Sequence, residues 1–158
     1  MKNPTLSIAL KVGMAFGLGL LVVGCGDPVP ELPHYKPKSL EQQGKGITIA
    51  KSTPYNCKIL GEVEGKDNTN GTRGATRELL REGALNDLKN EAGDTAGVGK
   101  RIMLNITNEE VLCSVVLEGK KGKTQQTIKC TDGLPSDAIN GKLLSHRIHA
   151  QVFDCGEK

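Results

Sequence analysis

Apolar residues recur at helical spacing in the middle of the chain, with charged side chains on the opposite face. The apolar positions are Ala75, Leu79, Leu80, Ala84, Leu85, Leu88 and Ala92. They predict an amphipathic α-helix whose N-terminal cap is Thr72 or Thr76. Gly93 and Gly97 are expected to stop it. Gly83, inside the predicted helix, costs about 1 kcal/mol relative to alanine, which suggests close packing on a sheet.

Short β-strands are predicted on both sides of this helix. Residues 57–63 form the strand candidate before it, and a loop signal follows over residues 64–71. The candidates after the helix are residues 101–106, 111–118, 124–130 and 146–155. A loop over residues 131–145 precedes the last of them. This order predicts an α+β fold in which one amphipathic helix packs on a small, mainly antiparallel sheet.

The first 24 residues have the features of a secretory signal peptide. Lys2 and Lys11 flank or precede an uncharged, mostly apolar run over residues 12–24. As a helix this run would extend for about 20 Å, which is short of the ~30 Å hydrocarbon core of a bilayer. We therefore expect a cleaved signal peptide over residues 1–24, with a retained N-terminal anchor helix as the alternative.

The apolar run ends in LVVGC, residues 21–25, which resembles the lipobox of bacterial lipoproteins. In a lipobox a small residue precedes the cysteine and gives the peptidase access to the backbone. The resemblance implies that Cys25 carries fatty acids such as palmitate and begins the mature protein. Two or more acyl chains anchor a protein stably, at ~0.8 kcal/mol per buried methylene. Asp27 stands one place after the position that retains enteric lipoproteins in the inner membrane, so the resemblance favours the outer membrane.

A proline-rich segment follows the cysteine. Residues 26–53 contain four prolines and no apolar periodicity, which predicts an extended tether with polyproline character. At ~3.1 Å per residue it would reach at most roughly 85 Å. His34 and Tyr35 are expected to be exposed in it, although the segment could instead lie along the domain surface. With Cys25 it makes up residues 25–53, and the folded domain is expected over residues 54–158.

Four cysteines remain when Cys25 is set aside: Cys57, Cys113, Cys130 and Cys155. An even number in a small secreted domain predicts two disulfides. If Lys121 and Gly122 form the centre of a hairpin turn, Cys113 lies directly opposite Cys130. Elimination then joins the remaining pair, Cys57 and Cys155.

A tetrahedral zinc site is the alternative use of these four cysteines. The sequence contains no C-x-x-C pair, and an oxidising compartment favours disulfides. Paired cysteines also do not act as nucleophiles. We therefore expect no metal at these positions.

The charge balance argues against nucleic acid as a ligand. The formal net charge is +3, and it falls to +1 when Lys2 and Lys11 are removed with the signal peptide. A protein this close to neutrality has no strong overall attraction to nucleic acid or to anionic lipid.

Catalytic motifs are weak throughout the chain. Residues 93–101 contain Gly-Lys but lack the spacing of a phosphate-binding loop. His146 and His149 point to opposite faces of a strand, so they do not form a metal pair. Glu109 and Glu110 precede a predicted strand and are expected to be solvated. We therefore expect a protein that is not an enzyme, uses no cofactor and has no evident small-molecule substrate.

The sequences CKILGEVEG, residues 57–65, and LKNEA, residues 88–92, resemble a group of small bacterial lipoproteins of unknown function. More distantly, they are similar to the RcsF type of envelope-stress lipoprotein. The resemblance covers roughly residues 57–113 and implies an outer-membrane lipoprotein that senses or binds. In the RcsF type the first cysteine joins the third and the second joins the fourth. That pairing would give Cys57–Cys130 and Cys113–Cys155 here, and it stands open beside the hairpin pairing.

These features together predict a non-catalytic lipoprotein of the bacterial cell envelope. We expect it to be anchored by lipid at Cys25, to face the periplasm from the outer membrane, and to bind, sense or support the envelope. Its partners would be the membrane and an envelope protein. The alternatives are a small cell-envelope hydrolase and a surface-exposed factor that binds host molecules.

Overall fold

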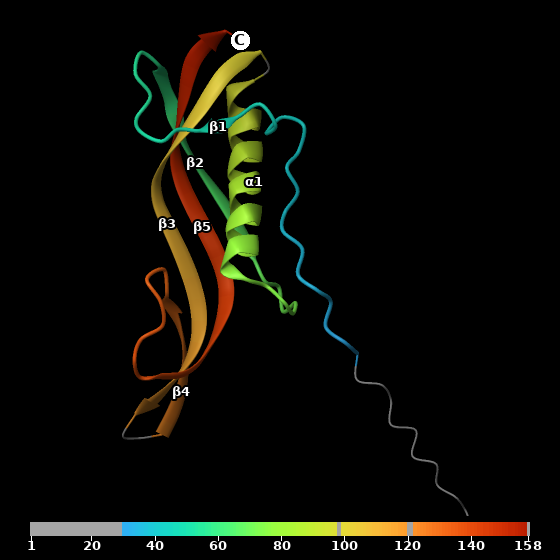
Figure 1. Cartoon of the computed structure of the whole chain (residues 1–158), viewed down its shortest axis with the longest axis vertical. Helices are drawn as coiled ribbons and strands as arrows, with labels where there is room; N and C mark the ends of the chain where they lie inside the picture. The colour runs from blue at the N-terminus through green and yellow to red at the C-terminus, as the bar shows by residue number, and fades with distance from the viewer. Residues whose placement is uncertain (1–29, 98, 120–121, 158) are drawn as a thin grey trace, which may run out of the picture. The chain divides into compact units, whose positions relative to one another are not determined.

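The computed structural model describes residues 30–97, 99–119 and 122–157, and from residue 31 onward the chain forms one compact unit. In this unit one helix packs on a five-stranded sheet (Figure 1). The elements in chain order are β1 (Thr48–Ile49), β2 (Lys58–Asn68), α1 (Arg77–Ala96), β3 (Lys100–Gly119), β4 (Gly122–Lys129) and β5 (Ala138–Glu157). The α+β prediction is confirmed in outline, but the sheet is mixed because β1 runs parallel to β3.

Two long strands form the centre of the sheet. The strand order is β1-β3-β5-β2, and β4 pairs with β3. All strand pairs other than β1–β3 are antiparallel. The strands β3 and β5 extend beyond the N-terminal end of α1, where β4 joins them (Figure 1). The upper half of the sheet therefore packs against the helix, and the lower half forms a projecting hairpin.

A β-bulge lets β3 run without interruption through residues 107–110. The sequence predicted two separate strands because these residues are polar. In the structure the pairing with β5 shifts by one residue between Ile106 and Asn108. One extra residue reverses the alternation of side chains, so Glu109 and Val111 face the same side as Leu104. The bulge thereby turns a glutamate toward the helix.

Two predicted loops are partly strand. The loop expected over residues 64–71 is wrong up to Asn68, because β2 continues to that residue in antiparallel pairing with β5. The loop expected over residues 131–145 is wrong from Ala138 onward, where β5 begins. In both places the partner strand supplies the backbone hydrogen bonds that local sequence signals did not anticipate.

The helix begins and ends as capping rules require. Thr76 is the N-cap, and its hydroxyl accepts a hydrogen bond from the Leu79 amide. Gly97 is the C-cap, with a positive φ of 74°. Gly93 does not stop the helix, contrary to expectation. It lies where Gln43 packs against the helix, since a Cβ at position 93 would be 2.5 Å from the Gln43 carbonyl oxygen.

Gly65 lets the helix backbone rest directly on β2. A Cβ at this position would lie 2.3 Å from the carbonyl oxygen of Ala84 and 2.5 Å from the Cβ of Leu88. Beneath this contact lies the main core, which contains Ile47, Ala84, Leu88, Ala92, Ala96, Ile102, Leu104, Ile148, Ala150 and Val152. The close packing that Gly83 suggested is therefore present, and Gly65 contributes to it from the sheet.

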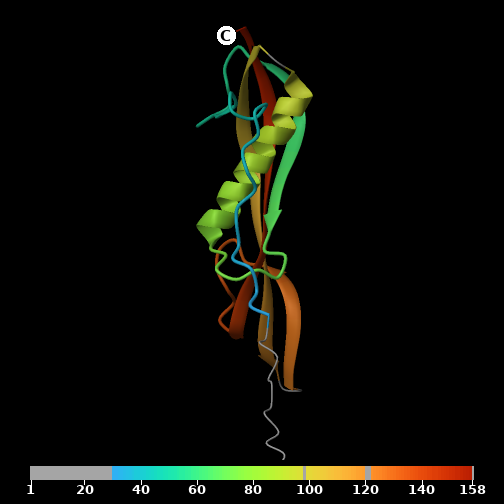
Figure 2. The same cartoon turned by 90° about the vertical axis from the view of Figure 1, so that its right-hand side faces the viewer.

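The segment before β1 is part of the folded unit from Glu31 onward, which corrects the tether prediction for residues 31–53 and the domain start at residue 54, while residues 26–29 of that prediction lie outside the described residues. We call residues 31–47 the strap; it runs alongside α1 (Figure 2). His34 is exposed as expected, but Tyr35 is only 8% exposed and Ile47 belongs to the core. The Asn90 amide nitrogen donates to the Ser39 carbonyl, and its amide oxygen accepts from the Glu41 backbone. Helix side chains thus satisfy the backbone of an element that has no regular structure of its own.

Replacing Gly65 with alanine should destabilise the domain strongly. Its new methyl group would overlap the helix backbone, and overpacking of this kind costs about 3 kcal/mol when the backbone must move. Gly119→Ala is the matched control, because a Cβ there meets only the Gly122 carbonyl oxygen, at 3.7 Å. Urea unfolding should show a large loss for the first variant and little change for the second. Equal stability of both variants would contradict the observed helix–sheet contact.

Candidate functional site

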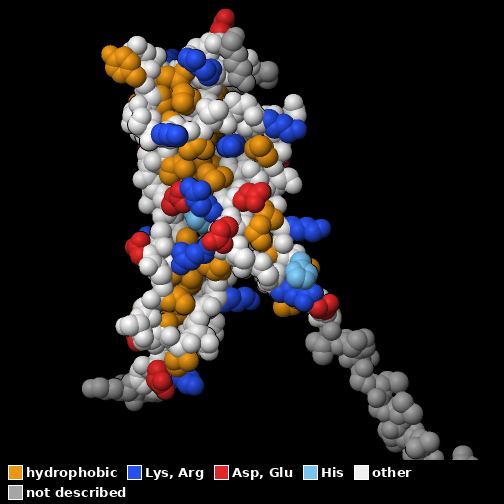
Figure 3. All heavy atoms as spheres, in the orientation of Figure 1, with side chains coloured by type: hydrophobic (Ala, Val, Ile, Leu, Met, Phe, Trp, Pro, Cys, Tyr) orange, Lys and Arg blue, Asp and Glu red, His pale blue; other side chains and the backbone are white. Residues whose placement is uncertain are grey.

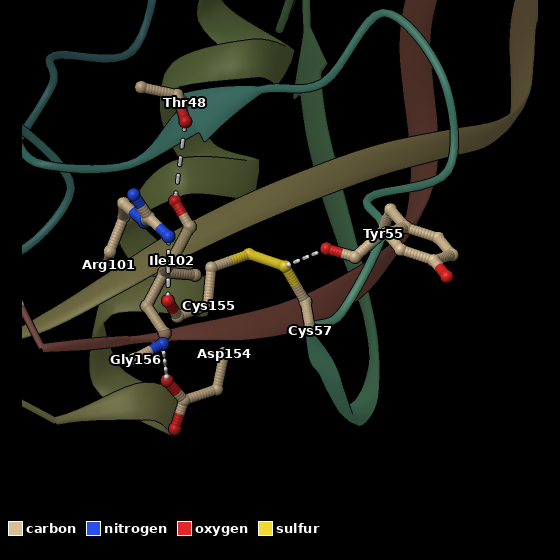
Figure 4. The surroundings of a disulfide bond; sticks show 8 residues. All are labelled: Thr48, Tyr55, Cys57, Arg101, Ile102, Asp154, Cys155 and Gly156. Carbon is tan, nitrogen blue, oxygen red and sulfur yellow. Dashed lines mark hydrogen bonds between the residues drawn. A yellow bond between two sulfur atoms is a disulfide. The ribbon is translucent and has the colours of Figure 1, made fainter.

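The predicted lipidation site, Cys25, lies outside the residues that the structure describes, as do the signal peptide and the lipobox. The other four predicted site residues form two disulfides. Cys57 and Cys155 join the start of β2 to the end of β5, with an S–S distance of 1.99 Å. In Figure 4 this bond lies beside Arg101, whose guanidinium donates to the Cys155 carbonyl over 2.8 Å. The far end of the sheet is closed by this covalent link.

The second disulfide links Cys113 and Cys130, with a Cα–Cα distance of 5.9 Å. The two cysteines are buried in a second cluster beyond the helix, with Val111 and Val115. These are the pairs that the hairpin argument proposed, and they differ from the RcsF-type pairing. The register in that argument is nevertheless wrong, because Gly119 pairs with Gly122 and Cys113 therefore lies opposite Ile128. Cys130 follows the end of β4, and its side chain reaches Cys113 diagonally.

A polar cluster lies between the N-terminal half of α1 and the sheet. Glu109 of β3 accepts two hydrogen bonds from the Arg81 guanidinium of α1, at 2.9 and 2.6 Å. Its Oε2 also lies 3.1 Å from Nε2 of His146 in β5. Glu109 was expected to be solvated, and this expectation is wrong because the bulge in β3 turns its side chain toward the helix. Three separate elements thus meet at one carboxylate.

The electrostatics of this cluster favour a charged glutamate and a neutral histidine. The hydrogen bonds from Arg81 lower the pKa of Glu109. His146 is only 4% exposed, and burial lowers its pKa although the Glu109 hydrogen bond opposes this. An ionised carboxylate only accepts, so Nε2 of His146 carries the proton. Its Nδ1 is buried and has no hydrogen-bond partner among the described residues.

A second buried carboxylate fixes the strap. Asp67 of β2 is 5% exposed and accepts hydrogen bonds from the Tyr35 hydroxyl, at 2.6 Å, and from the Lys38 amide, at 2.9 Å. Burial, with the Asp67 bond second, raises the pKa of Tyr35. Asp67 lies opposite His146 in the strand pairing. The two carboxylate groups therefore belong to one polar layer between the helix and the sheet.

The geometry of this layer suits a structural role better than catalysis. Both oxygens of Glu109 already accept hydrogen bonds from Arg81. A general base instead needs a carboxylate oxygen within reach of the substrate proton that it removes. His146 is enclosed, whereas His149 faces the other side of the sheet, 3.4 Å from Glu64. This separation agrees with the expectation that the two histidines do not form a pair. Within the described residues no cluster of three or more His, Cys, Asp or Glu side chains could hold a metal ion.

The sequence pattern indicates some members of this polar layer and not others. His146 has the same parity along β5 as Ile148, Ala150 and Val152, so alternation alone would place it against the core. Asp67 likewise shares the parity of Gly65. No signal marked Glu109, because its orientation depends on the bulge. The strap contacts depend on tertiary packing alone.

Comparison with protein-family models matches residues 38–155 to DUF4156, a domain of unknown function. The match covers about three quarters of the chain, and the chain belongs to this family. No curated protein matches the chain, and no solved structure matches it either.

The buried histidine should make stability depend on pH in a defined window. The folded pKa of His146 lies below its ordinary value of 6.5, so the unfolded chain takes up the proton first as pH falls. Stability should therefore decrease below about pH 6.5, by at most about 1.4 kcal/mol per pH unit for one proton. Urea unfolding between pH 7.5 and about 5 measures this slope without entering the ordinary range of glutamate.

The variant His146→Gln should reduce the change in the free energy of unfolding with pH. The control His34→Gln removes an exposed histidine and should leave this pH dependence as it is in the wild type. A slope that is the same in the wild type and in both variants would show that His146 is not buried in its neutral form.

Proposed function

We propose that this member of the DUF4156 family is a lipid-anchored, non-catalytic domain of the bacterial cell envelope, with a binding, sensing or structural role. The observation that carries the proposal is the pair of disulfides, Cys57–Cys155 and Cys113–Cys130. Disulfides persist in oxidising compartments and are rare in the reducing cytosol. A secreted destination agrees with the signal-like sequence before Cys25.

Lipid at Cys25 is the proposed means of attachment. Among the described residues, no helix has both the length and the hydrophobicity to cross a bilayer. The LVVGC sequence and the apolar run before it support acylation of the cysteine. The outer membrane, facing the periplasm, is the proposed location on the basis of Asp27.

The face of the sheet that α1 does not cover is the proposed binding surface for an envelope protein. Strand alternation places Glu64, Arg147 and His149 on this face, and Glu64 lies within 3.5 Å of both partners. Glu110 pairs there with Lys129. Charges of both signs are typical of surfaces that gain specificity from electrostatic complementarity. Figure 3, which views the domain from the edge of the sheet and not onto this face, also shows Asp and Glu side chains beside Lys and Arg.

The hydrolase alternative would need the Arg81–Glu109–His146 cluster as its active centre. Burial of His146 and the double hydrogen bond from Arg81 to Glu109 argue against that use. The alternative of a surface-exposed factor differs from the proposal in the side of the outer membrane on which the lipidated domain lies. The protease treatment described next distinguishes the two sides.

Cells that produce the full chain should incorporate an alkyne-tagged fatty acid into the wild type but not into Cys25→Ser. The physical reason is that acylation requires the thiol at this position. Labelled protein is measured after denaturing purification and fluorophore coupling. Protease treatment of intact cells should leave the labelled wild type uncut if the domain faces the periplasm.

Label on both proteins would overturn the proposed attachment. Photo-crosslinking from Gln151, on the same uncovered face, then tests the binding role. Crosslinks to one envelope protein support it, whereas crosslinks to lipid alone contradict it.

A further inference from the structure

We infer that the end of the domain formed by Leu32, Arg73 and Lys142 lies against the surface of the lipid bilayer. The inference rests on the proposed lipidation of Cys25. It concerns a membrane contact made by the folded domain itself, in addition to the covalent anchor.

The first step is the length of chain that separates the lipid from the folded domain. The strap is fixed close to its beginning, since the Arg73 amide donates to the Pro33 carbonyl at 3.0 Å and the Tyr35 amide donates to the Arg73 carbonyl at 2.9 Å. Glu31 adds an ion pair to Arg73 at 2.5 Å. Six peptide steps then connect Cys25 to Glu31, and at ~3.3–3.6 Å per residue they span at most about 20 Å. The roughly 85 Å tether expected from composition is thus reduced to this short linker, residues 25–31, which we call the leash.

The second step is the position of the hairpin relative to the point where the strap begins. The loop that carries Arg73 is level with the first half of β5, because the Thr69 amide donates to the Leu144 carbonyl at 2.9 Å. The next residue of β5 toward its start, Leu143, pairs with Cys113, and from there β3 continues for six residues to Gly119. At ~3.3 Å per residue the hairpin therefore projects about 20 Å beyond that level. Figure 1 shows the hairpin on the side of the helix N-terminus from which the strap also begins.

These two lengths are similar, so an upright domain whose hairpin tip touched the bilayer would hold the beginning of the strap about 20 Å above the headgroups, with the leash fully extended. Full extension of a flexible chain costs conformational entropy. A tilted domain relaxes the leash, because the hairpin tip and the beginning of the strap then both lie on the bilayer.

The third step is the chemistry of this end. Leu32 is 56% exposed and lines a hollow of about 390 Å³ that also contains Arg73 and Lys142. Thr69 and Thr72 contribute to its wall. An exposed leucine beside Lys142 suits the boundary between acyl chains and phosphate headgroups, whereas the charge of Arg73 is offset by its ion pair with Glu31. The opposite end exposes Tyr55, at 89%, and lies beyond the full length of α1 from the point where the strap begins.

The absence of tryptophan from the chain makes a direct test possible. Full-length Leu32→Trp and Tyr55→Trp, purified with their lipid, would each carry a single tryptophan. They are reconstituted in vesicles of phosphatidylcholine and phosphatidylglycerol whose acyl chains are brominated, because bromine quenches tryptophan on contact. Fluorescence at position 32 should be strongly reduced relative to unbrominated vesicles, and fluorescence at position 55 should be unchanged.

A charge reversal tests the role of the cations. Lys142→Glu in the Leu32→Trp background should reduce the quenching, whereas Lys45→Glu, an exposed lysine elsewhere on the strap, should leave it unchanged. Equal effects of the two reversals would contradict the proposed headgroup contact.

Mass spectrometry of the same samples separates the two proposals. Lipid on Cys25 with equal quenching at positions 32 and 55, or with none at either, overturns the bilayer contact and leaves the anchor intact. In the second case this end is free for a protein partner instead. Protein without lipid overturns the proposed attachment and, with it, the inference that rests on it.

Discussion

The buried carboxylate of Asp67 is the interaction on which the arrangement of this domain depends. It receives hydrogen bonds from the Tyr35 hydroxyl and the Lys38 amide of the strap while belonging to β2. It also lies against α1, since a Cβ at Gly83 would be 1.8 Å from its Oδ2. A polar group buried in this way is tolerated only when hydrogen bonds replace the water that it has lost. The side chain of Asp67 therefore contacts the strap, the helix and the sheet at the same point.

The consequences of this contact extend to both ends of the molecule. Because the strap packs against the helix, β1 lies at the edge of the sheet beside β3 and Ile47 is buried in the core. At the other end, docking fixes where the folded unit begins and so limits the reach of any lipid on Cys25. The disulfides then brace the two regions that the helix does not hold, the far end of the sheet and the projecting hairpin. The short leash and the two disulfides are compatible with the proposed position close to a membrane.

Local features of the fold could be read from the sequence, and features that depend on distant partners could not. The helix was predictable because its periodicity and the Thr76 cap are local. Gly83 gave a correct indication of close packing, for a reason that Asp67 supplies. The strap has the composition of a tether because hydrogen bonds that its backbone donates to Asp67 and Asn90 replace the apolar pattern that marks a folded element. The orientation of Glu109 was hidden by a bulge, and the hairpin register by a turn that is centred one residue earlier than expected.

Hydrogen–deuterium exchange of the strap tests the central claim most directly. Peptides covering residues 35–47 should exchange slowly in the wild type, because amides such as those of Lys38 and Glu41 donate to buried side chains. Tyr35→Phe removes one bond to Asp67 and should speed their exchange, while Tyr55→Phe, at a site 89% exposed, should not. Exchange in the wild type at the rate of an unstructured peptide would contradict the account.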